Sequence, residues 1–349
     1  MERTIKRAAI ITSGGDAPGM NACIRALTLT CLHYNIEVLG FKHGYNGLLN
    51  NDKKVLTEGA VRHIIHMGGT ILKSARCKTF HLDETAQKAA AVLDENNVDV
   101  LFVIGGDGSF RGANHLSNHW SGQVIGLPGT IDNDIDGTDY TIGFPTAVDT
   151  AIDAIDKVRD TADAFDRIFL VEVMGRRSGY LALNAGMGSG AEQVITPEQY
   201  KTPEKALKAI KQNIEAAREI RDSTSNIIVV AENFFPQGIH ELAETIEKDC
   251  GVHCRPFVLG YIQRGGAPVS HDRVLATKLG VAAVDYAKQG ASKVMIGEVD
   301  NHIKTYPLHL TGDGTKTVDK EMLRIQSHIL DDRRNTAEAR ANPKSFLDD

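Results

Sequence analysis

The sequence predicts an α/β protein of two Rossmann-like three-layer domains, each with a mainly parallel sheet. Short continuous apolar runs recur, each followed by apolar residues at helical spacing, which is the pattern of a parallel sheet covered by helices on both faces. Several of these runs end in glycine-rich polar loops, and such sheets bind ligands beyond the carboxyl ends of their strands. The chain has 349 residues, which exceeds a single hydrophobic core and indicates two domains.

Composition excludes several functional classes. Hydrophobic residues make up 42% and charged residues 24% of the chain, as in ordinary globular proteins. A net charge of −6 argues against a nucleic-acid partner. No apolar run approaches the ~20 residues that span a bilayer, so we expect no membrane partner. The amino-terminal residues lack the apolar core of a signal peptide, and a cytoplasmic location is therefore the expectation.

The five cysteines are too few and scattered to form a disulfide framework. Cys250 and Cys254 flank His253, which would suit a metal site, but a second ligand pair at fixed spacing is missing from the sequence. Small thiols without a metal are the favoured interpretation.

Apolar runs place the elements along the chain. In the first half we predict strands at residues 8–11, 37–41, 98–104 and 124–127. In the second half we predict an amphipathic helix at 148–158, strands at 168–173 and 227–231, and helices at 203–221 and 272–288. The stretch from about Asp331 is polar and is expected to be a solvated tail or surface helix.

The first polar loop, SGGDAPGMN at residues 13–21, joins a strand to a helix. Its glycines free backbone amides to converge on a phosphate at a helix N-terminus. A tight structural turn is an equally good interpretation of this loop alone.

The second loop, GGDGS at residues 105–109, ends the most apolar strand. Small residues leave room for a polyphosphate, and Asp107 could hold Mg²⁺. The alternative is a helix N-cap made by Asp107 or Ser109.

The third loop, PGTIDND at residues 128–134, places Asp132 and Asp134 two residues apart. In an extended segment these side chains face the same side, where one carboxylate could accept a proton and the other handle a metal. The alternative is an Asx-turn in which both aspartates bind backbone amides. We expect all three loops to share one edge of the sheet.

Together with MGRRSG (174–179) and LGYIQRGG (259–266), these motifs stand in an order that closely resembles bacterial-type phosphofructokinases. The resemblance runs over roughly residues 8–297. It implies an ATP-dependent enzyme that transfers the γ-phosphate of Mg-ATP to the 1-hydroxyl of fructose 6-phosphate.

The resemblance also implies roles for residues. Asp132 is implied as the general base, and Arg76 as the group that bridges the transferring phosphoryl group. The implied catalytic set is Gly15, Arg76, Thr130, Asp132 and Arg176. The implied nucleotide site is Gly15, Tyr45, Arg76, Cys77, Asp107, Gly108 and Ser109, with Asp107 as the Mg²⁺ carboxylate. The implied sugar-phosphate site is Thr130, Asp132, Asp134, Arg167, Met174, Gly175, Arg176, Glu232, Arg255, Tyr261 and Arg264.

The family architecture implies two domains with the active site in the cleft between them. Residues 1–142 plus 262–312 would form the larger, ATP- and Mg²⁺-binding domain. Residues 143–261 plus 313–349 would form the smaller, fructose 6-phosphate-binding domain with a carboxyl-terminal extension. Arg167 and Arg255 would reach a neighbouring subunit, which implies a homotetramer.

The sequence departs from the family pattern at the sugar-phosphate site and the effector site. Tyr261 stands where a histidine is usual, and we expect altered affinity there. Arg25 and Arg159 match the family's effector site, but Leu29 and Glu58 replace basic residues, so weakened allostery is expected.

The phosphoryl donor is predicted from two small residues. Gly108 and Gly129 stand where pyrophosphate-dependent enzymes usually carry Asp and Lys, which favours ATP. A pyrophosphate-dependent enzyme is the alternative within the family. The alternatives from other classes are a non-catalytic sugar-phosphate or nucleotide sensor and another kinase with a GGDG loop.

Overall fold

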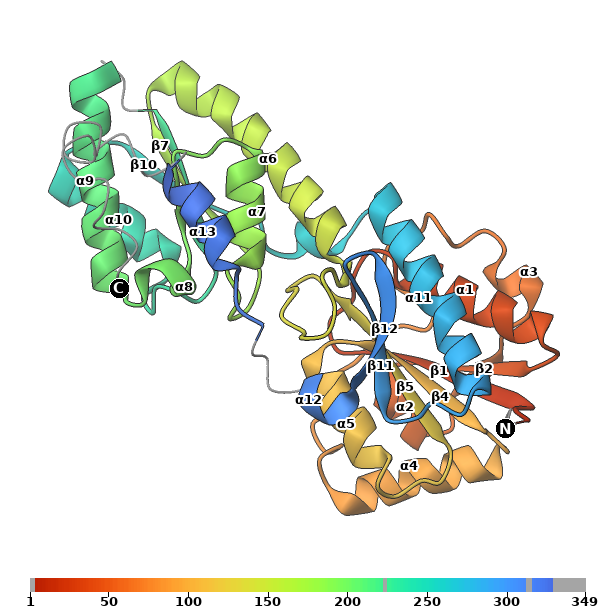
Figure 1. Cartoon of the computed structure of the whole chain (residues 1–349). Coiled ribbons are helices and arrows are strands. Elements are labelled where there is room, and N and C mark those ends of the chain that lie inside the picture. The colour runs from red at the N-terminus through yellow and green to blue at the C-terminus, as the bar shows by residue number, and fades with distance from the viewer. Residues whose placement is uncertain (1–3, 222–224, 312–315, 329–349) are drawn as a thin grey trace. The chain divides into compact units, whose positions relative to one another are not determined.

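A computed structural model describes residues 4–221, 225–311 and 316–328 (Figure 1). The chain divides into two compact units. Unit 1 comprises residues 1–147 and 264–316, and unit 2 comprises residues 148–263 and 317–349. The sequence-predicted boundaries fall a few residues before these division points. The predicted tail from about Asp331 lies outside the described residues.

Unit 1 contains a mixed, mostly parallel sheet in the strand order β12-β11-β5-β4-β1-β2-β3, with the short β6 paired to β5. The pairs β2–β3 and β11–β12 are antiparallel, and the other pairs are parallel. The strands are β1 (Arg7–Ser13), β2 (Glu37–Phe41), β3 (Lys53–Val55), β4 (Val100–Gly105), β5 (Gln123–Thr130), β6 (Ile142–Gly143), β11 (Val294–Val299) and β12 (His302–Pro307).

Helices cover both faces of this sheet (Figure 1). On one face, α1 (Met20–His33) packs against α11 (Ser270–Lys288). On the other face, α4 (Asp83–Glu95) and α5 (Asp107–Leu116) pack against each other. The short helices of the unit are α2 (Gly44–Leu49), α3 (Glu58–Val61) and α12 (Leu308–Thr311).

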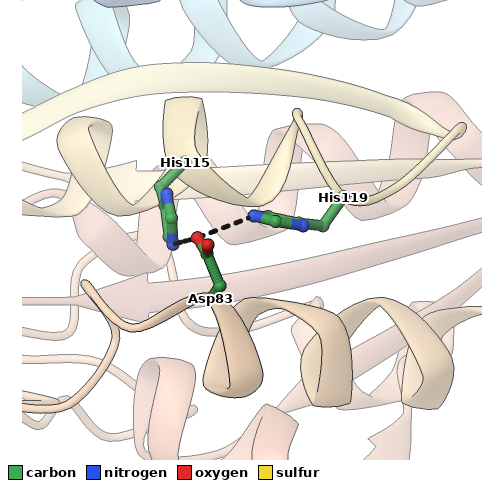
Figure 2. A group of neighbouring side chains, drawn as sticks. All are labelled: Asp83, His115 and His119. Atoms are coloured by element: carbon green, nitrogen blue, oxygen red, sulfur yellow. Dashed lines mark hydrogen bonds and ion pairs between the residues drawn. The ribbon is translucent and has the colours of Figure 1, made fainter.

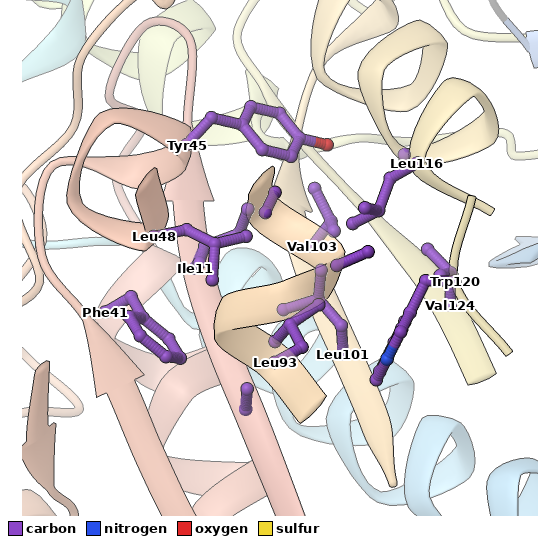
Figure 3. Close-up of a cluster of buried hydrophobic side chains, with 14 of the residues drawn as sticks. Ile11, Phe41, Tyr45, Leu48, Leu93, Leu101, Val103, Leu116, Trp120 and Val124 are labelled. Carbon is purple, nitrogen blue, oxygen red and sulfur yellow. The ribbon is translucent and has the colours of Figure 1, made fainter. Parts of the chain in front are cut away.

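The core of unit 1 explains why the central strands read as continuous apolar runs. Every residue of β4 is buried, because helices cover both of its faces. Figure 3 shows Ile11 of β1 and Leu101 and Val103 of β4 gathered with Leu93 of α4 and Leu116 of α5. The strands predicted in the first half of the chain are confirmed, with ends shifted by a few residues.

The parallel register aligns the ends of the three central strands. Ser13 of β1 pairs with Gly105 of β4, and Gly105 pairs with Pro128 of β5. The three polar loops therefore leave the sheet at the same edge, as the sequence predicted.

Unit 2 contains a second, fully parallel sheet in the order β10-β7-β9-β8. Its strands are β7 (Ile168–Val173), β8 (Gln193–Ile195), β9 (Asn226–Ala231) and β10 (Cys254–Val258). Its helices are α6 (Phe144–Phe165, which begins in unit 1), α7 (Tyr180–Gly188), α8 (Pro197–Tyr200), α9 (Pro203–Arg221), α10 (Gly238–Cys250), α13 (Lys320–Gln326) and the 3₁₀ helix Gly260–Arg264, which ends in unit 1.

Two helix layers also enclose the second sheet (Figure 1). Helices α9 and α10 pack on each other, and α7 packs on α13. Ile168 and Ile228 from the sheet join Ile210 of α9 and Ile246 of α10 in one buried cluster. Among the described residues, no helix combines the length and apolarity that crossing a bilayer requires.

The alignment of strand ends generates a prediction about Gly105. A β-carbon there would lie 2.5 Å from Ser109 Oγ and 2.6 Å from the carbonyl oxygen of Ser13, so Gly105→Ala crowds both the first turn of α5 and the neighbouring strand β1. We expect this variant to lose about 1–3 kcal/mol of unfolding free energy, measured by urea denaturation. Gly106→Ala is the matched control, because its β-carbon would meet only Thr130 at 3.6 Å. Equal stability of the two variants would contradict the close approach.

Candidate active site

The loop after β1 is held by two contacts within unit 1. The Ser74 hydroxyl donates to the Gly14 carbonyl at 2.7 Å, and Arg264 Nη1 donates to the Asp16 carbonyl at 3.0 Å. A β-carbon at Gly15 would lie 2.5 Å from Arg264 Nη1. With glycine here, the Arg264 guanidinium lies directly on the loop, whereas a side chain would displace it. Arg264, predicted for the sugar-phosphate site, is thus placed on the predicted nucleotide loop of unit 1.

The segment that contains Ser74 also carries Arg76 and Cys77. The Arg76 side chain is exposed, while Asn46 donates to its carbonyl oxygen at 3.4 Å. Cys77 is half-buried against the core cluster of unit 1. The Ser74 hydrogen bond ties this segment to the Gly14 loop, so Arg76 is kept near the carboxyl end of β1 with its side chain exposed.

The loop after β4 leads directly into α5. The helix N-cap is Gly106, and it makes no side-chain capping bond. The alternative that Asp107 or Ser109 is the N-cap is therefore wrong. Asp107 Oδ1 accepts from the Gly108 amide at 2.5 Å, and Asp107 Oδ2 pairs with Arg111 Nη1 at 3.2 Å. Asp107 thus presents an oriented carboxylate at the positive end of a helix.

The Tyr45 side chain supports this loop through a hydrogen bond to Ser109. Its side chain is 3% exposed and stacks on Phe80 with ring centroids 3.8 Å apart. Its hydroxyl donates to the Ser109 carbonyl at 2.7 Å. Burial raises the pKa of the Tyr45 phenol, so the hydroxyl remains a donor. The structure therefore places Tyr45 as a support of the first turn of α5.

The loop after β5 carries Asp132 and Asp134, both buried. The expected extended segment is wrong, because Asn133 has φ of 50°, in the left-handed region. Its side chain compensates: Asn133 Nδ2 donates to the Asp139 carbonyl at 3.1 Å, and Oδ1 accepts from the Thr141 amide at 3.0 Å. Asn133, between the two aspartates, therefore binds a backbone amide of this loop.

Thr130 joins this loop to the strand end. Its hydroxyl accepts from the Asp132 amide at 3.2 Å, and its carbonyl accepts from the Thr141 hydroxyl at 2.6 Å. Because Thr141 thus contacts both Thr130 and Asn133, the Asp132 backbone is fixed on both sides.

Lys316 is a cation beside this loop that sequence reasoning missed. Its Nζ donates to the carbonyls of Thr138 and Asp139, each at 2.8 Å. Burial lowers the pKa of Lys316 to about 8, although the carboxylates of Asp139, Asp136 and Asp134 oppose that shift. Its separation from these residues along the chain leaves no local sequence signal.

In unit 2, Glu232 organises the loop after β7. Glu232 Oε1 accepts from the amides of Gly175 at 3.1 Å and of Arg176 at 2.6 Å. The Met174 amide donates to Gln263 Oε1 at 3.3 Å. Gly175 and Arg176 have φ of 139° and 60°, values that differ from those of strands and right-handed helices. The Glu232 carboxylate therefore stabilises an irregular backbone conformation of this loop. The Arg176 side chain is exposed.

A second carboxylate lies near Glu232. Burial and the negative charge of Glu232 raise the pKa of Glu172, and His240 opposes this shift. The carboxyl end of the second sheet therefore combines acidic groups with the exposed Arg176.

Two predicted arginines of unit 2 do not lie at this edge. Arg167 immediately precedes β7, and Arg255 lies near the start of the parallel neighbour β10. Arg176 follows β7, so these two arginines and Arg176 lie at opposite ends of the strands. Arg167 lies over the Phe165 ring at 4.5 Å, and Arg255 pairs with Glu247 at 2.8 Å.

Two further residues named in the sequence analysis, Tyr261 and Arg159, also lie in unit 2. Tyr261 lies in the 3₁₀ helix and is 83% exposed. Arg159, from the predicted effector site, pairs with Glu192 at 3.1 Å.

The Lys316 environment predicts a pH dependence of stability. The pKa is about 8 in the folded chain against an ordinary 10.5, so the unfolded state binds more protons between these values. The unfolding free energy should therefore rise with pH across this window. We expect this rise in the native chain and its loss in Lys316→Met, compared by urea denaturation at several pH values. Parallel pH profiles would contradict the assignment.

Comparison with known proteins agrees with this arrangement. The phosphofructokinase family matches residues 7–287. An ATP-dependent 6-phosphofructokinase of Shouchella clausii is 46% identical over 93% of this chain and 99% of its own length. A phosphofructokinase structure from Saccharomyces cerevisiae superposes with a TM-score of 0.81 at 32% identity, over 94% of this chain and 48% of that longer chain.

A pyrophosphate-dependent phosphofructokinase from Nitrosospira multiformis shares the fold, with a TM-score of 0.80 at 20% identity over 91% of this chain and 86% of its own. The family match covers most of the chain and includes all three loops at the edge of the first sheet. The chain belongs to the phosphofructokinase family.

Proposed function

We propose that this chain is an ATP-dependent 6-phosphofructokinase. It transfers the γ-phosphate of Mg-ATP to the 1-hydroxyl of fructose 6-phosphate, giving fructose 1,6-bisphosphate and ADP. The observation that carries the proposal is the alignment of Ser13, Gly105 and Pro128 at one sheet edge. It brings a glycine loop, the Asp107 loop and the Asp132 loop to one place, in a chain 46% identical to a relative named for this activity.

The donor phosphates bind at the loops after β1 and β4 in this proposal. Gly15 and Gly108 lack side chains, and the N-terminus of α5 follows the end of β4 directly, where the helix dipole favours a phosphate. Arg264 lies on the Gly15 loop, and Arg76 is exposed on the adjoining segment. These guanidiniums neutralise the charge that the phosphoryl group carries during transfer.

The residues of this edge fit Mg²⁺. Asp107 offers a carboxylate oxygen already oriented by the Gly108 amide and Arg111, and Mg²⁺ takes one or two carboxylates together with substrate phosphates. Bound there, Mg²⁺ would neutralise phosphate charge. Asp107 would hold it, with Gly106 and Gly108 leaving the space.

Asp132 accepts the proton of the sugar hydroxyl in this mechanism. Asn133, Thr130 and Thr141 fix its backbone, and a general base must be held within hydrogen-bond reach of the proton it removes. Lys316 offsets the charge of Asp134 nearby, which limits repulsion between the carboxylates of this loop.

Unit 2 supplies the sugar-phosphate ligands in the proposal. Arg176 projects from the loop that Glu232 fixes, and Tyr261 is exposed in the 3₁₀ helix. An arginine fork suits a phosphate because it can engage two oxygens. In this proposal, transfer requires residues of both units.

A homotetramer completes that site. Arg167 and Arg255 lie at the far end of the strands from Arg176, so one chain does not present all three at the same sheet edge. This placement supports the prediction that Arg167 and Arg255 serve a neighbouring subunit. A cytoplasmic location remains part of the proposal.

The choice of ATP over pyrophosphate rests on Gly108. Its β-carbon position is open, with Arg111 Nη2 at 3.7 Å as the nearest atom. Gly129 differs, because a β-carbon there would point at Ile104 at 2.9 Å and Met20 at 3.2 Å. Close packing alone thus explains why residue 129 is a glycine. Gly108 is therefore the better indicator of which phosphoryl donor the chain uses.

The first test measures fructose 6-phosphate phosphorylation with Mg-ATP and with Mg-pyrophosphate. We expect turnover with ATP, and Asp132→Asn should lower kcat by about 10²- to 10⁴-fold because the general base is lost. Asp139→Asn makes the same charge change at an exposed position of the same loop and should retain activity. Turnover with pyrophosphate alone would overturn the donor assignment, and no turnover with either donor would favour a sensor.

The second test replaces Gly108. Gly108→Asp puts a carboxylate beside the donor phosphates, and like charges a few ångströms apart cost on the order of 1 kcal/mol. We expect the KM for ATP to rise about tenfold. Gly108→Ala adds only a methyl group in open space and should bind ATP as the native chain does. An unchanged KM in Gly108→Asp would remove Gly108 from the donor site.

A further inference from the structure

Three metal-ligand side chains converge on unit 1 away from the three loops at the sheet edge. Asp83 is the first residue of α4, His115 lies in the last turn of α5, and His119 follows that helix. Figure 2 shows both imidazoles pointing at the Asp83 carboxylate. Asp83 Oδ1 lies 3.1 Å from His119 Nε2 and 3.4 Å from His115 Nε2, and the three ligand atoms all lie within 4.8 Å of one another.

These separations suit ligands of one small ion. Zn²⁺ binds imidazole nitrogen at 2.0–2.1 Å and carboxylate oxygen at about 2.0–2.2 Å, with tetrahedral angles. Two ligands at that distance are about 3.3 Å apart across the metal. Both measured separations lie close to that value, so an ion could enter with small adjustments of the side chains.

The His115 imidazole is incompletely satisfied. Its Nε2 atom is buried and makes no hydrogen bond among the described residues, and its ion-pair contact with Asp83 Oδ1 is long, at 3.4 Å. A buried nitrogen in this condition is costly, and a metal bond would satisfy it. The side chains of His115 and His119 are 24% and 20% exposed, whereas that of Asp83 is 71% exposed, so an ion can reach the cluster from the solvent side.

We propose that Asp83, His115 and His119 bind a divalent transition metal of the zinc class, with water in the fourth position. The two imidazoles select against Mg²⁺, which prefers oxygen ligands. This site is therefore distinct from the Mg²⁺ carboxylate proposed at Asp107, and the inference does not rest on the proposed function.

The metal would connect two helices that begin at or soon after segments predicted for the nucleotide site. Helix α4 begins a few residues after Arg76 and Cys77, and α5 begins at Asp107. A bond from the start of α4 to the end of α5 would restrict both helices. We therefore expect metal binding to stabilise unit 1.

The sequence gives little signal for this cluster. His115 and His119 are four residues apart, but His119 lies beyond the end of α5, so this spacing does not place both on one helix face. Asp83 is separated from His115 by 32 residues and from His119 by 36, so only the packing of α4 on α5 reveals the third ligand. Without a metal, Asp83 at the start of α4 and His115 at the end of α5 would still favour the helix dipoles. The experiment separates these two roles.

The chain contains a suitable reporter. Trp120 is its only tryptophan, is 6% exposed, and follows His119 directly. Its Nε1 donates to Asp94 Oδ1 at 2.8 Å, which fixes the indole beside the cluster. Open-shell Co²⁺ bound at the cluster would quench this fluorescence, whereas Co²⁺ bound elsewhere would not.

The test titrates the full chain with Zn²⁺ by calorimetry, in excess Mg²⁺, and follows Trp120 fluorescence with Co²⁺. We expect one Zn²⁺ per chain at this cluster, a higher melting temperature with Zn²⁺, and quenching by Co²⁺. His115→Gln and His119→Gln should each weaken Zn²⁺ binding by at least about tenfold and abolish the quenching, with melting temperatures of the metal-free chains close to the native value.

Matched controls locate the site. His302→Gln removes an exposed histidine of β12 and should bind Zn²⁺ normally. Cys250→Ser removes a half-buried thiol and should also bind normally. Absence of Zn²⁺ stabilisation and Co²⁺ quenching in the native chain would overturn the proposal. Loss of binding in Cys250→Ser with normal binding in His115→Gln would also overturn it, because the ion would then lie at the thiols.

Discussion

The in-register pairing of β1, β4 and β5 at Gly105 is the constraint on which the predicted nucleotide site depends. Gly105 pairs with Ser13 on one side and with Pro128 on the other. A side chain at Gly105 would meet the Ser13 carbonyl oxygen. Glycine at this position therefore allows the ends of β1 and β4 to pair in register. Three loops then begin at one edge of the sheet, and their amides, carboxylates and nearby guanidiniums can act on one polyphosphate.

Side chains that bind the backbone then hold each loop in place. Ser74 binds the Gly14 carbonyl, Tyr45 binds the Ser109 carbonyl, and Asn133 binds the Thr141 amide. Glu232 does the same for the loop after β7 in unit 2. These contacts fix the backbone before a ligand arrives, so less conformational entropy is lost on binding. Arg76 and Arg176 are exposed beside these loops.

Local patterns were enough to predict much of the fold. The strand at 168–173 and the helix at 203–221 are found at the predicted residues, because apolar periodicity reflects each element's own buried face. Contacts distant in sequence were not predictable: Lys316 beside the Asp134 loop, Arg264 on Gly15, and Asp83 against two histidines. The left-handed backbone conformation of Asn133 was also not predicted, because it depends on hydrogen bonds with Asp139 and Thr141.

Hydrogen–deuterium exchange with and without Mg-ADP can show whether the three strand-end loops form one binding edge. We expect slower amide exchange in residues 14–19, 106–109 and 130–134 together, with the same dependence on ligand concentration. Protection confined to one of these loops at saturating ligand, or protection of none, would contradict the claim that the aligned strand ends form a single site.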